Sequence, residues 1–182
     1  MENNSTLYYQ HPYGLLYYGN CLEIMPTLPD KSIDMILCDL PYGTTIGKWD
    51  IIIPFTSLWI EYKRLIKDNG AIILTASQPF TTLLIISNLQ WFKYCWIWEK
   101  TRPTGHIHAK NKPLKIHEDI CVFSSGTTVH KTQSKNRMPY NPQGTIEINE
   151  KSYRPGRGTK DYITYGMRQS HKKTILHTHK NY

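Results

Sequence analysis

The 182-residue sequence has no long apolar segment, and its longest aliphatic runs, such as 83-LLII-86, are far too short to span a bilayer. The amino terminus, MENNSTLYYQHPYG, lacks the basic start and apolar core that are typical of a secretion signal. Four cysteines stand far apart, without the paired spacing of a zinc site or a disulfide framework: Cys21, Cys38, Cys95 and Cys121. We therefore expect a cytoplasmic protein with reduced thiols, no metal and no membrane partner.

Most of the chain has no net charge. Residues 1–126 hold eleven basic and eleven acidic side chains, whereas residues 127–182 hold eleven basic and three acidic ones. The net charge of +8 therefore belongs to the carboxyl-terminal region, where polar residues, glycine and proline also dominate. A neutral body with a basic end is typical of proteins that contact a polyanion, most often nucleic acid, although a solvated basic tail has the same composition. We predict one domain over 1–126 and a separate basic region over 127–182.

The first 126 residues alternate between strand-like and helix-like segments. The predicted order is a strand (15–20), a short or bent helix (21–32), a strand (33–39), a helix (54–70), a strand (71–76), a helix (79–88), and strands 92–100 and 116–123 separated by a basic loop (101–115). The run 33-IDMILCD-39 is almost continuously apolar, which is typical of a parallel strand covered on both faces. Trp96 and Trp98 share one face of their strand and are expected in the core. This alternation predicts an α/β fold with an open parallel sheet.

One acidic residue stands at the end of that apolar strand. Asp39 is followed directly by Leu40, Pro41, Tyr42 and Gly43. In open α/β sheets, ligands bind outside the carboxyl ends of the strands, so a carboxylate and an aromatic ring are expected together at the rim. The same pentapeptide is also an ordinary turn sequence in which the aspartate caps its own loop. Taken alone, it does not decide between a site and a turn.

Longer stretches carry a resemblance to a known family. The segment 19-GNCLEIMPTLPDKSIDMILCDLPYG-43 resembles the Asp-Pro-Pro-Tyr motif region of DNA amino-methyltransferases. The stretches LTASQPF, FKYCWIWEKTRPTGH and HEDICVF resemble the phage and bacterial adenine-specific members, in the same order along the chain. The resemblance covers about residues 15 to 126. It implies the Rossmann-like sheet of S-adenosylmethionine-dependent methyltransferases, in a cytoplasmic enzyme of a bacterium or host, of the kind found in restriction–modification systems.

The resemblance also implies a chemistry for the motif. Such enzymes transfer the methyl group of S-adenosyl-L-methionine to an exocyclic amine of a base that is flipped out of double-stranded DNA. It assigns the two acceptors for the amine to the side chain of Asp39 and the carbonyl between Leu40 and Pro41, and it places Tyr42 on the flipped base. Aspartate at this position favours adenine N6 over cytosine N4. Leu40 replaces the usual proline, which keeps the backbone carbonyl but loses the fixed φ.

Cofactor and DNA contacts are implied less directly. Asn20 and the backbone N–H of Cys21, in the turn 19-GNC-21, are expected to meet the adenine of the cofactor, together with Asp39, although a plain Gly-Asn turn explains the sequence nearly as well. Cations of the basic loop are expected to contact phosphates beside the flipped base, with a solvated loop as the alternative. The predicted DNA-binding residues are Lys100, Arg102, His106, Lys110 and Lys112. The region 127–182 takes the place of target recognition or of a disordered tail.

Two motifs of the family are missing from this sequence. They are the His-Pro-Thr-Gln-Lys-Pro helix and the Phe-x-Gly-x-Gly turn, which in the family grips the methionine end of the cofactor. We therefore expect an incomplete sheet without its central strands, and a chain that binds the cofactor poorly unless a second polypeptide supplies them. One half of a split enzyme and an inactive DNA-binding remnant are the alternatives. Methylation of RNA or of protein amides is disfavoured by the basic end and by the match through 92–123.

Overall fold

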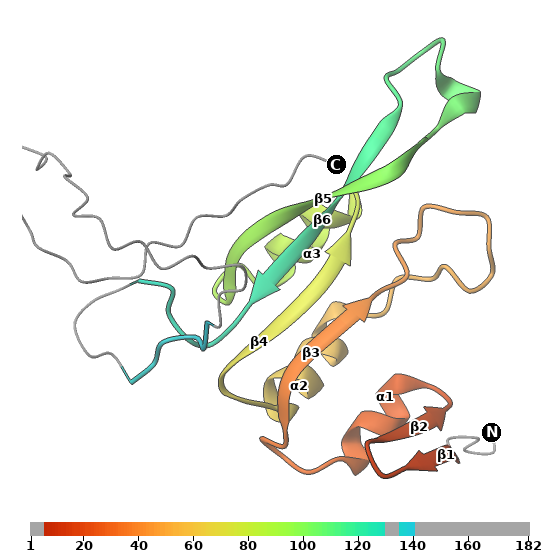
Figure 1. The fold of residues 1–182 in the computed structure, drawn as a ribbon. Coiled ribbons are helices and arrows are strands. Elements are labelled where there is room, and N and C mark those ends of the chain that lie inside the picture. The colour runs from red at the N-terminus through yellow and green to blue at the C-terminus, as the bar shows by residue number, and fades with distance from the viewer. Residues whose placement is uncertain (1–5, 130–134, 141–182) are drawn as a thin grey trace, which may run out of the picture. The chain divides into compact units, whose positions relative to one another are not determined.

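The computed structural model describes residues 6–129 and 135–140. Strands and helices alternate along these residues, as Figure 1 shows. The elements are β1 (Thr6–His11), β2 (Gly14–Tyr18), α1 (Cys21–Ile24), the 3-10 helix η1 (Met25–Thr27), β3 (Ile33–Asp39), α2 (Phe55–Leu65), β4 (Ile66–Ala76), α3 (Phe80–Ser87), β5 (Phe92–Thr104), the 3-10 helix η2 (His106–His108) and β6 (Lys115–Phe123).

Four of the strands form one sheet in the order β3-β4-β6-β5. β3 and β4 are parallel and are joined through α2, whereas β6 runs antiparallel to both β4 and β5. The predicted α/β class is confirmed, but the sheet is mixed rather than parallel throughout. Among the residues that the structure describes, β3 pairs only with β4 and so forms an edge of this sheet, as expected for an incomplete fold.

The predicted strand over 15–20 belongs to a separate hairpin. β2 pairs antiparallel with β1, which the sequence analysis did not predict, and the two strands form their own two-stranded sheet. The connecting turn contains Pro12 and Tyr13. The side chains of β2 are all exposed.

One face of the four-stranded sheet is covered by helices. α2 and α3 lie on the same side of it in Figure 1. α2 buries Leu58, Trp59, Tyr62 and Leu65, the apolar stripe that its sequence predicts. The sheet side chains beneath the helices are almost completely buried and include Ile72, Leu74, Cys121 and Phe123. Apolar burial on this face therefore provides the main stabilisation of the fold.

α2 ends earlier than predicted, at Leu65 rather than near Gly70. Ile66 continues the apolar spacing of the helix, but it begins β4 and pairs with Ile33 of β3. A Cβ atom on Gly70 would lie 2.9 Å from the carbonyl oxygen of Asp34, so the glycine allows this close approach of the two strands. Pairing with β3 thus overrides the helical periodicity.

The opposite face of the sheet is largely open. Met35 and Leu37 of β3 are 53% and 65% exposed, and Trp96 and Trp98 of β5 are 52% and 46% exposed. The core placement predicted for the two tryptophans is therefore wrong. Their strand periodicity was correct, but within the described residues no helix covers the face on which they lie.

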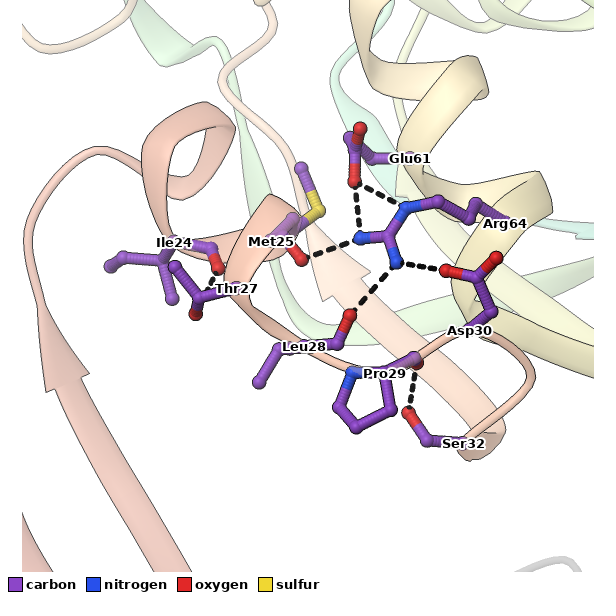
Figure 2. A network of polar contacts seen from close by, with 9 residues as sticks. All are labelled: Ile24, Met25, Thr27, Leu28, Pro29, Asp30, Ser32, Glu61 and Arg64. Carbon is purple, nitrogen blue, oxygen red and sulfur yellow. Dashed lines mark hydrogen bonds and ion pairs between the residues drawn. The ribbon is translucent and has the colours of Figure 1, made fainter.

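A single arginine ties α2 to the segment that precedes β3 (Figure 2). The two terminal nitrogens of Arg64 donate to the carbonyl oxygens of Leu28 and Met25, at 2.8 and 2.7 Å. They also pair with the carboxylates of Asp30 and Glu61, at 2.5 and 2.6 Å. Because carbonyls and carboxylates surround the planar guanidinium, this site requires arginine rather than lysine.

The boundary predicted at residue 126 remains a prediction. The chain separates into Met1–Pro139 and Tyr140–Tyr182, and all of the second unit after Tyr140 lies outside the described residues. The roles predicted for 127–182 fall largely on that part. None of the described helices has the length and apolar content needed to cross a bilayer.

Candidate active site

Asp39 and Thr75 end two neighbouring strands and lie opposite each other. They are partners in the parallel pairing of β3 with β4. The Thr75 hydroxyl donates to Oδ1 of Asp39. The Tyr42 hydroxyl donates to the same Oδ1 at 2.7 Å and lies 2.9 Å from the Thr75 hydroxyl. Both hydroxyls bind Oδ1 of Asp39. They orient the carboxylate and leave Oδ2 outside these two hydrogen bonds.

The ring of Tyr42 has an aromatic support. It stacks on Phe80 at the start of α3, with the ring centroids 5.1 Å apart and the planes inclined by 25°. Phe80 is fully buried and also packs against Phe55. Burial raises the pKa of Tyr42 above its usual range, and the hydrogen bond with Thr75 only partly opposes this shift. Tyr42 is therefore a neutral phenol that keeps its proton for the bond to Asp39.

Leu40, which replaces the usual proline, has a structural role. Its side chain is buried in the core, whereas Asp39 before it is exposed. The apolar side chain therefore anchors the turn from inside, at the point where the family resemblance expects the rigidity of proline. Pro41 follows and is half-buried.

The loop after Gly43 is organised by Asp50. This buried carboxylate accepts hydrogen bonds from three consecutive backbone N–H groups, those of Gly43, Thr44 and Thr45, at 2.8, 2.8 and 2.7 Å. Burial opposes ionisation of the group, but these hydrogen bonds outweigh it and lower the pKa of Asp50 to about 2. The loop that follows the Asp39–Tyr42 motif is thus held from within by an ionised side chain.

Asn20 forms an N-cap in the structure. Its Oδ1 accepts a hydrogen bond from the backbone N–H of Leu22, at 3.1 Å, and its amide donates to Glu23 at 3.2 Å. These contacts explain the Gly-Asn sequence by capping α1. The amide is exposed and retains one N–H and one lone pair, so it still fits the edge of an adenine. The cofactor role of Asn20 remains a prediction.

Cys21 lies near the end of β3. Burial is the main reason that the pKa of the Cys38 thiol is raised, and the neighbouring Cys21 and Asp39 add to the shift. Cys21 is thus within electrostatic range of the residue that immediately precedes Asp39. Cys21 also packs against the core, and its predicted contact with the cofactor remains a prediction.

The predicted DNA-binding residues lie on an arm formed by the end of β5, by η2 and by the turn that leads to β6, here called the basic arm (residues 100–115). It projects beyond the rest of the sheet in Figure 1. Lys100 is partly neutralised, because its Nζ lies 2.8 Å from Glu118 and 3.4 Å from the ring centroid of Trp98. The other predicted members are exposed: Arg102, His106, Lys110 and Lys112. The predicted loop therefore begins as the last residues of β5 and continues through η2 to Lys115, and its DNA contacts stay predictions.

The sequence analysis missed three residues that shape this site: Thr75, Phe80 and Asp50. Thr75 had a signal, since it is a polar residue near the carboxyl end of the strand predicted after Asp39. The other two act through contacts that no local pattern reveals. Among residues 6–129 and 135–140, no group of three His, Cys, Asp or Glu side chains is placed to hold a metal ion.

Comparison with known proteins supports a relationship to methyltransferases. No protein-family model matches the chain. The Type II methyltransferase M2.MboI of Moraxella bovis is 33% identical over 121 residues, which cover 52% of this chain and 44% of that protein. The Type II methyltransferase M.HinfI of Haemophilus influenzae is 32% identical over 152 residues, which cover 64% of this chain and 42% of that protein.

A partial likeness to a solved structure accompanies these relatives. The crystal structure of the M1.HpyAVI–SAM complex superposes with a TM-score of 0.42 at 14% identity, covering 64% of this chain and 59% of that one. Matches to the two relatives span less than half of their length, 44% and 42%. Over these segments, the chain is similar to Type II methyltransferases.

Proposed function

We propose that this chain is the catalytic part of an S-adenosylmethionine-dependent DNA amino-methyltransferase. The similarity to Type II methyltransferases supports the general reaction. The observation that carries the proposal is the geometry at Asp39, where Thr75 and Tyr42 hold one carboxylate oxygen at the rim of the sheet. An oriented carboxylate with a second oxygen available is what recognition of an amine requires.

The chain's own residues position and activate the amine. An exocyclic amine is a weak nucleophile because its lone pair is delocalised into the ring of the base. Oδ2 of Asp39 accepts one N–H of the amine, and the carbonyl of Leu40 accepts the other. These two hydrogen bonds favour a pyramidal nitrogen with a localised lone pair. Tyr42, supported by Phe80, stacks on the flipped base and fixes the plane of its ring.

S-adenosyl-L-methionine supplies an activated methyl group when it is bound. We assign the contact with its adenine to Asn20 and to the backbone N–H of Cys21, which lies near the end of β3. Asp39, at the same strand end, is the third residue that would contact the cofactor. Neither assignment needs a metal ion.

Adenine N6 is the proposed target. Support for this assignment comes from aspartate at position 39 and from the resemblance of the segments 74–80, 92–106 and 117–123 to adenine-specific enzymes. Double-stranded DNA is the proposed partner, and Arg102, Lys110 and Lys112 of the basic arm contact its phosphates. Cytosine N4 is the alternative target, and identification of the modified base distinguishes the two.

A second polypeptide is part of the proposal. The exposed apolar side chains of Met35, Leu37 and Trp96 on the open face are typical of a surface that another part of a protein covers. We propose that a partner chain covers this face and completes the cofactor site. Without this partner chain, the protein would bind DNA but would not modify it.

The test compares two aspartates of the same strand. The full chain, Asp39→Ala and Asp34→Ala are expressed in cells that lack adenine methylation, alone and with candidate partner genes. Modified bases in the genomic DNA are then read by single-molecule sequencing. Asp39→Ala removes the acceptor of the amine, so we expect modification at a defined sequence to fall about 100-fold or more.

Asp34→Ala is the control, because Asp34 is an exposed residue of β3 whose pairing with Lys67, at 2.6 Å, is distant from the rim. Modification that survives in Asp39→Ala contradicts the proposed role of the carboxylate. A wild-type chain that modifies no base in any combination, yet binds DNA in a salt-dependent manner, would instead identify a binding remnant.

A further inference from the structure

The loop between β3 and α2 presents an exposed tryptophan on a fixed support. Residues 43–50 leave the carboxyl end of β3 directly after Tyr42, as Figure 1 shows. Three backbone N–H groups at the start of this loop bind the carboxylate of Asp50, and the Asp50 N–H donates to the Gly47 carbonyl at 2.9 Å. Trp49 lies within this loop, and these hydrogen bonds fix the backbone on both sides of it.

The indole of Trp49 lies against the backbone of Gly47. A Cβ atom at position 47 would lie 2.6 Å from Nε1 and 2.8 Å from Cε2 of the indole, so only glycine admits the ring in this position. The rest of the side chain faces outward, since Trp49 is 76% exposed and belongs to neither the core nor the residues packed against it. Removal of the ring therefore opens no cavity in the fold.

We propose that Trp49 is a stacking platform for an unpaired nucleobase that lies beside the nucleotide held by Asp39 and Tyr42. The inference rests on the proposed function and adds to it a second base-binding residue and a ligand class, unstacked DNA bases. The indole lies against Gly47, is exposed, and is carried by the loop that follows Tyr42. Lys48, also exposed, supplies a cation for the adjoining phosphate.

Asp50 and Gly47 are positioning residues in this proposal. Asp50 fixes the loop and Gly47 makes room for the ring, but neither has to touch DNA. A purely structural role for Trp49 predicts no effect on DNA affinity. A role in stacking predicts lower affinity without loss of any phosphate contact, and hence an unchanged dependence on salt.

The experiment uses the full chain and a fluorescein-labelled fifteen-nucleotide oligo(dA), which needs no recognition sequence. Binding is measured by anisotropy at several salt concentrations. Trp49→Ala is expected to bind about tenfold more weakly at every salt concentration, with the same slope against salt. Gly47→Ala keeps the indole but displaces it, so we expect a smaller loss. Trp96→Ala, which removes an exposed tryptophan from the open face, is the matched control and should leave affinity unchanged.

The outcomes separate this inference from the proposed function. Wild-type binding that Trp49→Ala leaves unchanged overturns the platform, while the assignment of Asp39 stands on its own test. A wild-type chain that binds neither oligo(dA) nor duplex DNA at low salt overturns both. Equal losses in Trp49→Ala and Trp96→Ala would indicate a general aromatic contribution and also overturn the inference. Quenching of tryptophan fluorescence by unlabelled oligo(dA), lost in Trp49→Phe, would give independent support.

Discussion

The two faces of the four-stranded sheet differ in cover but not in composition. On β3, Ile36 and Cys38 pack toward the helices, whereas Met35 and Leu37 alternate with them and are exposed. Both sets are apolar, so the sequence of this strand suits a sheet that is covered twice. The apolar pattern on both sides of β3 is therefore typical of a strand with both faces covered. Among the described residues, helices cover only one of these faces.

The largest expected difference is between two leucines on adjacent strands. Leu74 of β4 is fully buried under the helices, and Leu37 of β3 is mostly exposed on the open face. Leu74→Ala should lower the free energy of unfolding by about 3 kcal/mol because it leaves a cavity. Leu37→Ala should change it by less than about 0.5 kcal/mol. Urea unfolding followed by circular dichroism measures both, and equal losses would mean that the open face is covered in solution.

Substitution of Arg64 should weaken the attachment of α2 to the covered face without creating a cavity in the core. Arg64→Ala removes the bonds that attach α2 to the segment before β3, so the melting temperature should fall by less than in Leu74→Ala but measurably. Lys67→Ala, which removes an exposed ion pair with Asp34, is the control and should have little effect. Similar melting temperatures for the two variants would show that the arginine contacts add no more than a surface ion pair.

The stability that the loop of residues 43–50 contributes should depend on pH in the acid range. The pKa of Asp50 is about 2 in the fold, below its ordinary value of 3.8. A lowered pKa contributes stability that is present above about pH 4 and is lost as the pH falls through about 2. Wild-type stability should therefore decline more steeply between pH 4 and pH 2 than that of Asp50→Asn. Asp68→Asn, at an exposed ion pair with Lys31, should follow the wild type. A parallel decline in Asp50→Asn would contradict the assignment.

Much of the fold that supports the site was predictable from sequence. The strand ending at Asp39 was predicted with its observed bounds, because a continuous apolar run flanked by Ser32 and Pro41 leaves little choice. α3 was also predicted closely, since Pro79 and the apolar run after it define its start. Asp39 and Tyr42 were predicted as members of one site because they are close in sequence, although the hydrogen bond between them was not predicted.

The rest depended on contacts distant in sequence. Thr75 reaches Asp39 only because β3 and β4 pair in one particular register, which neither strand encodes alone. The end of α2 was misplaced because Ile66 satisfies both a helical stripe and a strand pairing. Trp96 and Trp98 were placed in the core because periodicity reveals which residues share a face, but not whether anything covers that face. The sequence analysis predicted the strand that became β2 but missed β1, TLYYQH, which lacks the regular polar–apolar alternation used to recognise strands.

The two ends of β6 differ in burial. Burial along this strand increases from the arm to its end at Phe123, where the last three residues are buried between β4 and β5. The outer residues of β6 pair with β5 alone, whereas residues 119–123 pair with both β4 and β5, so the tip can bend while the base stays fixed. Amide hydrogens near Lys115 should therefore exchange quickly, and those near Phe123 only when the whole domain opens. This gradient gives the arm reach without weakening the sheet that carries Asp39.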